Sequence, residues 1–115
     1  MKYSLQHMIL CICFLLLLGC SNDKIISKPL YQKSEEIISL VNQLQWEKAN
    51  EEVRVIEDLY QKDEWKFQLL GDESEYDGLN QEISQLKVSI QEEDKMEAKS
   101  SLVIIQDYIR AIYFR

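Results

Sequence analysis

The chain is poor in the residues that carry most catalytic and metal chemistry. It has one histidine, His7, and three cysteines, Cys11, Cys13 and Cys20, all within the first 20 of its 115 residues. The rest of the chain can form no disulfide. It also cannot build the commonest nucleophile–base pairs or a zinc site, because these need histidine or cysteine. We therefore expect it to be non-enzymatic, with no catalytic residues and no metal.

Glycine and proline are also scarce. Pro29 is the only proline, and Gly71 and Gly78 are the only glycines after Gly19. No long stretch alternates between apolar and polar residues as a strand would, and the apolar residues recur at helical spacing. These features predict an all-α fold.

Basic residues are outnumbered, with 13 lysines and arginines against 20 aspartates and glutamates and a net charge of −7. Binding to nucleic acid requires clustered basic side chains, and so does lying flat on anionic lipid. We therefore expect no nucleic acid partner. The acidic balance favours solubility, or as an alternative the attraction of cations or basic partners.

The N-terminal segment contains an apolar run, Met8–Leu18, of eleven residues. A membrane-spanning helix needs about 20 apolar residues, whereas the hydrophobic region of a signal peptide needs about 7–15. Leu17, Leu18, Gly19 and Cys20 close this run and resemble the lipobox of bacterial lipoprotein precursors. In that family a signal peptidase cuts before the cysteine, whose thiol then carries a diacylglycerol.

The resemblance implies that residues 1–19 are a lipoprotein signal peptide and that 20–29 are the lipidated cysteine and a tether. The diacylglycerol on Cys20 would be the only attached group. Two acyl chains hold a protein stably at a bilayer, so we expect a location on the extracytoplasmic side of the cell membrane. An uncleaved N-terminal anchor is the alternative, and it places the rest of the chain on the same side.

Four helices are predicted within a helical domain of residues 30–115. The first extends over about Leu30–Leu44, directly after Pro29, which suits a first helical turn. The second runs from Trp46 to about Leu70, where Gly71 suits a helix end. Their apolar faces are formed by Leu30, Ile37, Val41 and Leu44, and by Ala49, Val53, Ile56 and Tyr60.

The third and fourth helices are each expected to start at a capping box. Ser74 and Asp77 form a loose box for the third helix, and Asp94 and Glu97 form one for the fourth. Their apolar stripes are Leu79, Ile83, Leu86 and Ile90, followed by Ala98, Leu102, Ile105, Ile109 and Ile112.

These helices predict two antiparallel αα-hairpins that form a small four-helix bundle. The alternative is a three-helix bundle with one long first helix, because neither glycine nor proline interrupts residues 42–46. The two halves also match at an offset of 49 residues, although any two heptad stripes align at some offset. Leu30, Ile37, Val41, Ala49, Val53 and Ile56 then align with Leu79, Leu86, Ile90, Ala98, Leu102 and Ile105.

Two groups of residues are candidate sites. The acidic residues Asp72, Glu73, Glu75 and Asp77 resemble half of an EF-hand loop, but its bidentate position falls on Ser84, so a solvated turn is the better interpretation. The aromatic residues are candidates for a protein interface, with packing as the alternative. The possible interface residues are Trp65, Tyr113 and Phe114.

Several of these features together resemble a known family. A helix opens with the residues Trp46–Ala49 and reaches Trp65, an acidic segment follows, and two apolar stripes then lie on either side of Asp94. Over residues 30–112 this is similar to the bacterial envelope proteins grouped as domain of unknown function 4363. Members often carry a histidine in the segment matching residues 71–73, which this chain lacks. The resemblance implies an envelope location and a helical fold, and it implies no activity.

The sequence favours a membrane-anchored surface lipoprotein that acts as an interaction or accessory module for another envelope or membrane protein. A stable anchor, a short tether and the lack of catalytic side chains support this interpretation. The alternative is a lipoprotein that binds a small ligand or a cation between its helices.

Overall fold

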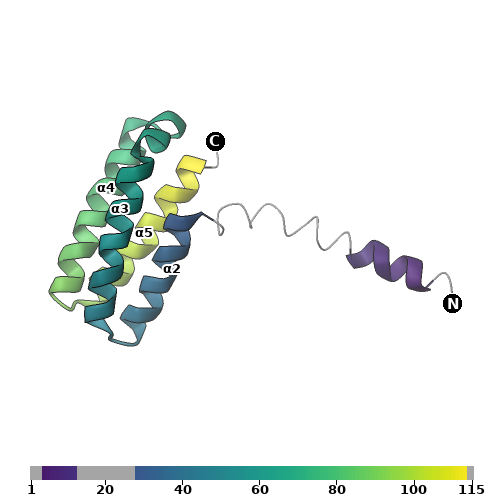
Figure 1. Ribbon diagram of the computed structural model, residues 1–115, viewed down its shortest axis with the longest axis horizontal. Coiled ribbons are helices and arrows are strands. Elements are labelled where there is room, and N and C mark those ends of the chain that lie inside the picture. Colours follow the sequence, from purple (N-terminus) through teal and green to yellow (C-terminus); the bar gives the residue numbers. More distant parts are fainter. Residues whose placement is uncertain (1–3, 13–27, 114–115) are drawn as a thin grey trace.

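The computed structural model describes residues 4–12 and 28–113, which contain helices and no strand. Residues 4–12 form a helix. The remaining helices are α2 (Pro29–Asn42), α3 (Trp46–Leu70), α4 (Glu73–Gln91) and α5 (Lys95–Tyr113) (Figure 1). The predicted all-α fold is confirmed. No helix in the described part of the chain is both long enough and apolar enough to cross a membrane.

Helices α2–α5 lie side by side (Figure 1). α2 packs against α3 and α5, α4 packs against the same two helices, and α3 and α5 barely touch. The four helices therefore surround one shared core, which the predicted apolar stripes fill. Buried stripe residues are Leu30, Ile37, Val41, Ala49, Val53, Ile56, Tyr60, Leu79, Ile83, Leu86, Ile90, Ala98, Leu102, Ile105, Ile109 and Ile112.

The chain reverses between α2 and α3. α2 ends at Asn42, and Leu44 has a φ of 58°, in the left-handed region that ends a helix. The alternative of one long first helix is therefore wrong. The prediction that Leu44 lies on the buried stripe is also wrong, because the helix ends before it and the side chain is 58% exposed.

α4 begins earlier than its predicted capping box. Asp72 is the N-cap, and its Oδ1 accepts a hydrogen bond from the Glu75 N–H at 3.1 Å while the Asp72 N–H donates to Glu75 Oε1 at 3.0 Å. Ser74 and Asp77 lie inside the helix, so the box predicted from them is wrong. Asp72 and Glu75 satisfy two free N–H groups at this helix start, where acidic side chains are also favoured by the helix dipole.

The loops of the two hairpins repeat each other at an offset of 49 residues. Glu93, in the α4–α5 loop, has a φ of 54°, close to that of its counterpart Leu44. The residue after each, Gln45 or Asp94, donates its N–H to the carbonyl five positions earlier at 2.9 Å. The aligned core stripes and the two loops thus give α2–α3 and α4–α5 the same local design.

Candidate functional site

The acidic segment at the start of α4 does not gather into a cation site. Among the described residues, no three Asp, Glu, His or Cys side chains are placed so that they could hold a metal ion. Asp72 and Glu75 are used in the capping box. Gly78 is helical, and a Cβ atom added there would lie 2.5 Å from the phenol of Tyr108. This glycine therefore allows α4 and α5 to approach closely.

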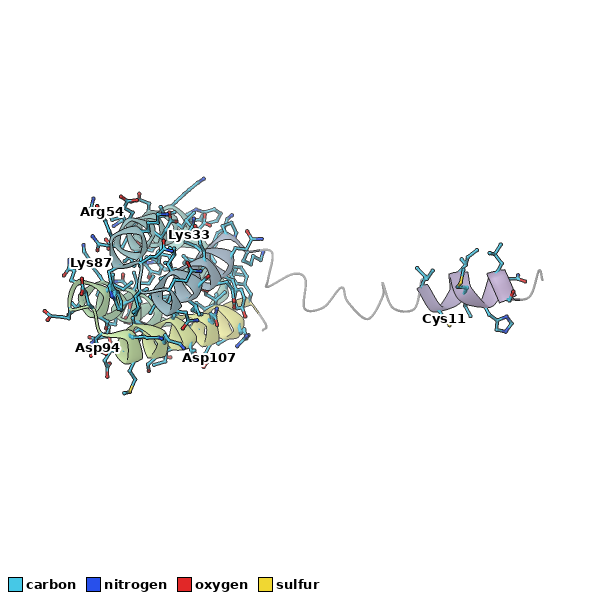
Figure 2. The ribbon with its side chains drawn as sticks, turned by 90° about the horizontal axis from the view of Figure 1, so that it is seen from below. Cys11, Lys33, Arg54, Lys87, Asp94 and Asp107 are labelled. Carbon is cyan, nitrogen blue, oxygen red and sulfur yellow. The ribbon has the colours of Figure 1, made fainter. Side chains whose placement is uncertain are left out.

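The residues expected to carry the anchor, Leu17, Leu18, Gly19 and Cys20, lie outside the described residues, as does Phe114. The described helix at residues 4–12 contains Cys11, whose side chain is exposed (Figure 2). The predicted tether is described only at its end, where Pro29 occupies the first turn of α2.

Stacked aromatic rings hold the end of α3 against the end of α5. The Tyr60 and Phe67 rings stack with their centroids 5.4 Å apart. The Phe67 and Tyr113 rings meet edge to face, with their centroids 6.1 Å apart. Lys28 Nζ lies 4.5 Å from the centroid of the Tyr113 ring. The residue that precedes α2 therefore contacts the end of α5, and Tyr113 contributes to the packing of α5 against the end of α3.

The end of α3 also carries apolar side chains that face solvent. Trp65 is 57% exposed, Leu69 is 76% exposed and Leu70 is 46% exposed. Trp65 and Leu69 are one helical turn apart, so their side chains are neighbours on the helix surface. Lys66 Nζ lies 5.6 Å from the Trp65 ring centroid. We call Trp65, Leu69 and Leu70 the α3 end surface.

The two tyrosines of the aromatic stack are neutral at physiological pH. Burial raises the pKa of Tyr113 above 10.0, and the charge of Asp63 adds to the shift. Burial likewise raises the pKa of Tyr60, with smaller contributions from neighbouring acids. The Tyr60 hydroxyl donates a hydrogen bond to the Tyr76 carbonyl at 3.1 Å. These phenols therefore pack and donate hydrogen bonds, and they are poorly suited to proton transfer.

A groove of about 370 Å³ lies between α3 and α4. Lys87 Nζ is 3.3 Å from Glu57 Oε1 across it. That oxygen is buried, and it accepts no well-formed hydrogen bond from the described residues, although the lysine lies within ion-pair distance. The groove is lined by Glu57, Tyr60, Gln61, Asn80, Ile83, Ser84, Lys87 and Val88.

The α2/α5 interface contains a polar network that the sequence analysis did not predict. Gln106 is buried, and its Nε2 donates to Ser34 Oγ at 2.9 Å and to Glu35 Oε1 at 2.8 Å. Arg110 donates to the Tyr31 hydroxyl at 2.7 Å. The only signal in the sequence is a glutamine directly after the stripe residue Ile105, which periodicity alone does not mark as buried.

Charged side chains are distributed over the molecule. Figure 2 shows Lys33, Arg54, Lys87, Asp94 and Asp107 spread around the four helices rather than gathered on one side. Lys33 bridges Glu36 at 2.8 Å and Glu52 at 2.6 Å, which joins α2 to α3. Charge alone therefore does not single out a site, and we take the α3 end surface and the α3/α4 groove as candidate features among the described residues.

Comparison with known proteins gives the chain a family. The model of the Domain of unknown function (DUF4363) matches residues 21–114. The chain belongs to this family. No curated protein and no solved structure matches it. The match covers all of α2–α5 and with them both candidate features of this DUF4363 protein, and the family description assigns no activity to either.

Proposed function

We propose that this DUF4363 protein is a surface lipoprotein held at the extracytoplasmic face of the cell membrane by a diacylglycerol on Cys20. Its helices α2–α5 form a four-helix bundle of two αα-hairpins. The bundle acts without catalysis, as an interaction or accessory module for another envelope or membrane protein. No cofactor beyond the lipid is required.

The α3 end surface is the observation that carries this proposal. Tryptophan is enriched among the residues that dominate binding energy at protein interfaces. Trp65 and Leu69 here are neighbours on the surface of α3, exposed Leu70 follows at the end of the helix, and Phe67 is buried on its inner side. A rigid backbone that presents neighbouring apolar side chains supports binding to a protein partner, because little side-chain or loop freedom is lost on association.

The position of this surface supports a partner close to the membrane. Lys28, just before α2, contacts Tyr113 at the end of α5, and the Tyr113 ring in turn meets Phe67 near the end of α3 that carries the α3 end surface. From Cys20 to Lys28 the chain can span at most about 30 Å, since an extended residue covers about 3.3–3.6 Å. A lipid on Cys20 would thus keep Trp65 within reach of the outer parts of membrane proteins.

Site-specific photocrosslinking in intact cells tests the partner. A photoreactive phenylalanine analogue at position 65 is expected to give one recurrent protein adduct, and Leu69→Ala should weaken it by about tenfold or more. Met96 is the matched control, since it is 79% exposed and lies at the start of α5, by the other end of α4. Equal adducts from both positions, or adducts to lipid alone from position 65, would refute a specific partner at this surface.

The anchor is tested separately by metabolic labelling with an alkyne fatty acid. The wild-type chain should take up the label and remain with membranes, and Cys20→Ser should lose the label. Cys11→Ser is the control for a neighbouring thiol. Label retained by Cys20→Ser would show that the lipid is attached elsewhere or that the lipobox is not used.

A further inference from the structure

The two hairpins allow position-by-position comparison of two interfaces. An offset of 49 residues exchanges α2 with α4 and α3 with α5, so the α2/α5 interface corresponds to the α4/α3 interface. In the first, Tyr31 is buried with 6% of its surface exposed, and its hydroxyl accepts a hydrogen bond from Arg110. Gln106 donates across the same interface to two acceptors on α2. Side chains thus fill and bridge this interface.

The corresponding positions between α3 and α4 leave the groove open. Asn80, at the position of Tyr31, is short and exposed, and Gln61 stands in place of Arg110. Glu57 occupies the position of Gln106, and its buried Oε1 lacks a well-formed hydrogen bond. The groove therefore arises where a repeated framework exchanges a large aromatic side chain for a small amide.

We propose that this groove binds a small zwitterion of the amino-acid type. The ammonium group of the ligand donates to Glu57, its carboxylate pairs with Lys87, and its apolar side chain lies against Ile83 and Val88. The amides of Gln61 and Asn80 and the hydroxyl of Ser84 line the same groove, where they can donate to or accept from the ligand.

The charges of the groove favour a ligand that carries both signs. Glu57 and Lys87 together are neutral, so a ligand with one net charge would leave one of them without a partner. The Lys87 side chain is 44% exposed. Its ammonium can therefore turn outward to the carboxylate of the ligand while the ammonium of the ligand takes its place beside Glu57. Charge-assisted hydrogen bonds of this kind are the stronger ones in proteins.

The size of the groove sets the scale of the ligand. A volume of about 370 Å³ lies at the lower end of the about 300–1,000 Å³ typical of small-molecule sites. It suits a single amino acid better than a cofactor. The groove involves none of Trp65, Leu69 and Leu70, so this proposal goes beyond the partner-binding role and can fail independently of it.

Thermal unfolding of the full chain in detergent micelles, with leucine as the probe, tests the proposal. At about ten times its dissociation constant, leucine should raise the Tm by about 5 °C or more. Isoamylamine keeps the ammonium and loses the carboxylate, and 4-methylpentanoate does the reverse, so neither should raise the Tm appreciably. If isoamylamine or 4-methylpentanoate raises the Tm as much as leucine does, the ligand need not be a zwitterion and that part of the proposal is refuted. If neither leucine nor any of the other amino acids raises the Tm, the proposed binding site is refuted.

Substitutions that bring residues of the α2/α5 interface into the α3/α4 groove test whether leucine binds in the groove. Asn80→Tyr introduces the residue found at the corresponding position 31, so it should fill the groove and abolish the leucine shift. Glu57→Gln should weaken binding by at least about tenfold, because it removes the charge that the ammonium meets. Glu51→Gln, an exposed change on the same helix, should leave binding unchanged. Unfolding by circular dichroism checks that each variant is folded, and full binding by Glu57→Gln contradicts the assignment.

Discussion

The α2/α5 and α3/α4 interfaces share a framework and differ in how they are closed. Both bury the same repeated stripe positions, including Ile56 on α3 and Ile105 on α5, neither of which is exposed to solvent. The first is bridged by Gln106 and Arg110, whereas the second is crossed by the Glu57–Lys87 pair above a groove. The stripe therefore determines which helices pack together, and a few positions beside the stripe determine whether space remains between them.

The largest effects are expected where the two hairpins are equivalent. Ile56→Ala and Ile105→Ala each remove a fully buried side chain and should lower the free energy of unfolding by about 2–5 kcal/mol. Urea unfolding followed by circular dichroism measures both. Losses that differ by more than about 2 kcal/mol would contradict the equivalence of these positions, since cavity costs at matched sites should be similar.

A smaller effect separates the interfaces. Gln106→Glu places a carboxylate in a buried site and directs it toward Glu35, which should cost about 1–3 kcal/mol of unfolding free energy. The reciprocal change Glu57→Gln removes a partly exposed ion pair and should cost no more than about 0.5 kcal/mol. The same urea experiment compares them. Equal costs would mean that the groove is as closed as the opposite interface.

The two loops should respond alike to glycine. Leu44 and Glu93 hold φ angles of 58° and 54°, which cost an L-residue about 1–2 kcal/mol and cost glycine nothing sterically. The greater entropy of glycine in the unfolded chain offsets part of this gain. Leu44→Gly and Glu93→Gly should therefore each raise the free energy of unfolding by about 0.5–1 kcal/mol. Glycine at Gln43, where φ is −87°, is the control and should not stabilise. Stabilisation by one loop variant alone would show that the loops differ in strain.

The apolar periodicity predicted most of the fold, but it predicted little of the difference between the α2/α5 and α3/α4 interfaces. The spacing of stripes such as Leu79 to Ile90 identified the helices and their buried faces, because burial of one face is a local property of helical geometry. It misplaced Leu44, since a helix end depends on a backbone conformation that apolarity does not report. The start of α4 was misplaced for a similar reason, because several acidic residues could cap it and only one pair does so.

The candidate sites were predicted only in part. Trp65 is a possible interface residue by its aromatic type alone, and the structure places it on an exposed surface. The Glu57–Lys87 groove was not predicted, because 30 residues separate its two charged groups and helix packing alone brings them together. Aligning the halves at an offset of 49 does pair Tyr31 with Asn80. The sequence therefore shows that position 80 lacks the aromatic ring of position 31, but it does not show that these positions lie at corresponding helix interfaces.

The smallest expected effect concerns pH, and it again distinguishes the interfaces. Tyr60, at the α3/α4 groove, corresponds to Ile109, which cannot titrate. Burial, then the charges of Glu64 and Asp77, raise the folded-state pKa of Tyr60 above the 10.0 of the unfolded chain. The folded state thus holds the phenolic proton more tightly. The stability from this group is complete below pH 10 and is lost as the pH rises through the folded pKa.

Unfolding free energies measured between pH 8 and about pH 11 should therefore fall above pH 10. Tyr60→Phe should make that fall shallower, while Ile109→Val, the matched control, should leave its slope unchanged. The fall should persist in part, because the pKa values of Tyr113 and Lys33 are also raised, the first by burial and the second by hydrogen bonds to Glu36 and Glu52. An unchanged slope in Tyr60→Phe would mean that water reaches this phenol through the groove, and the α3/α4 interface would then be more open than its packing indicates.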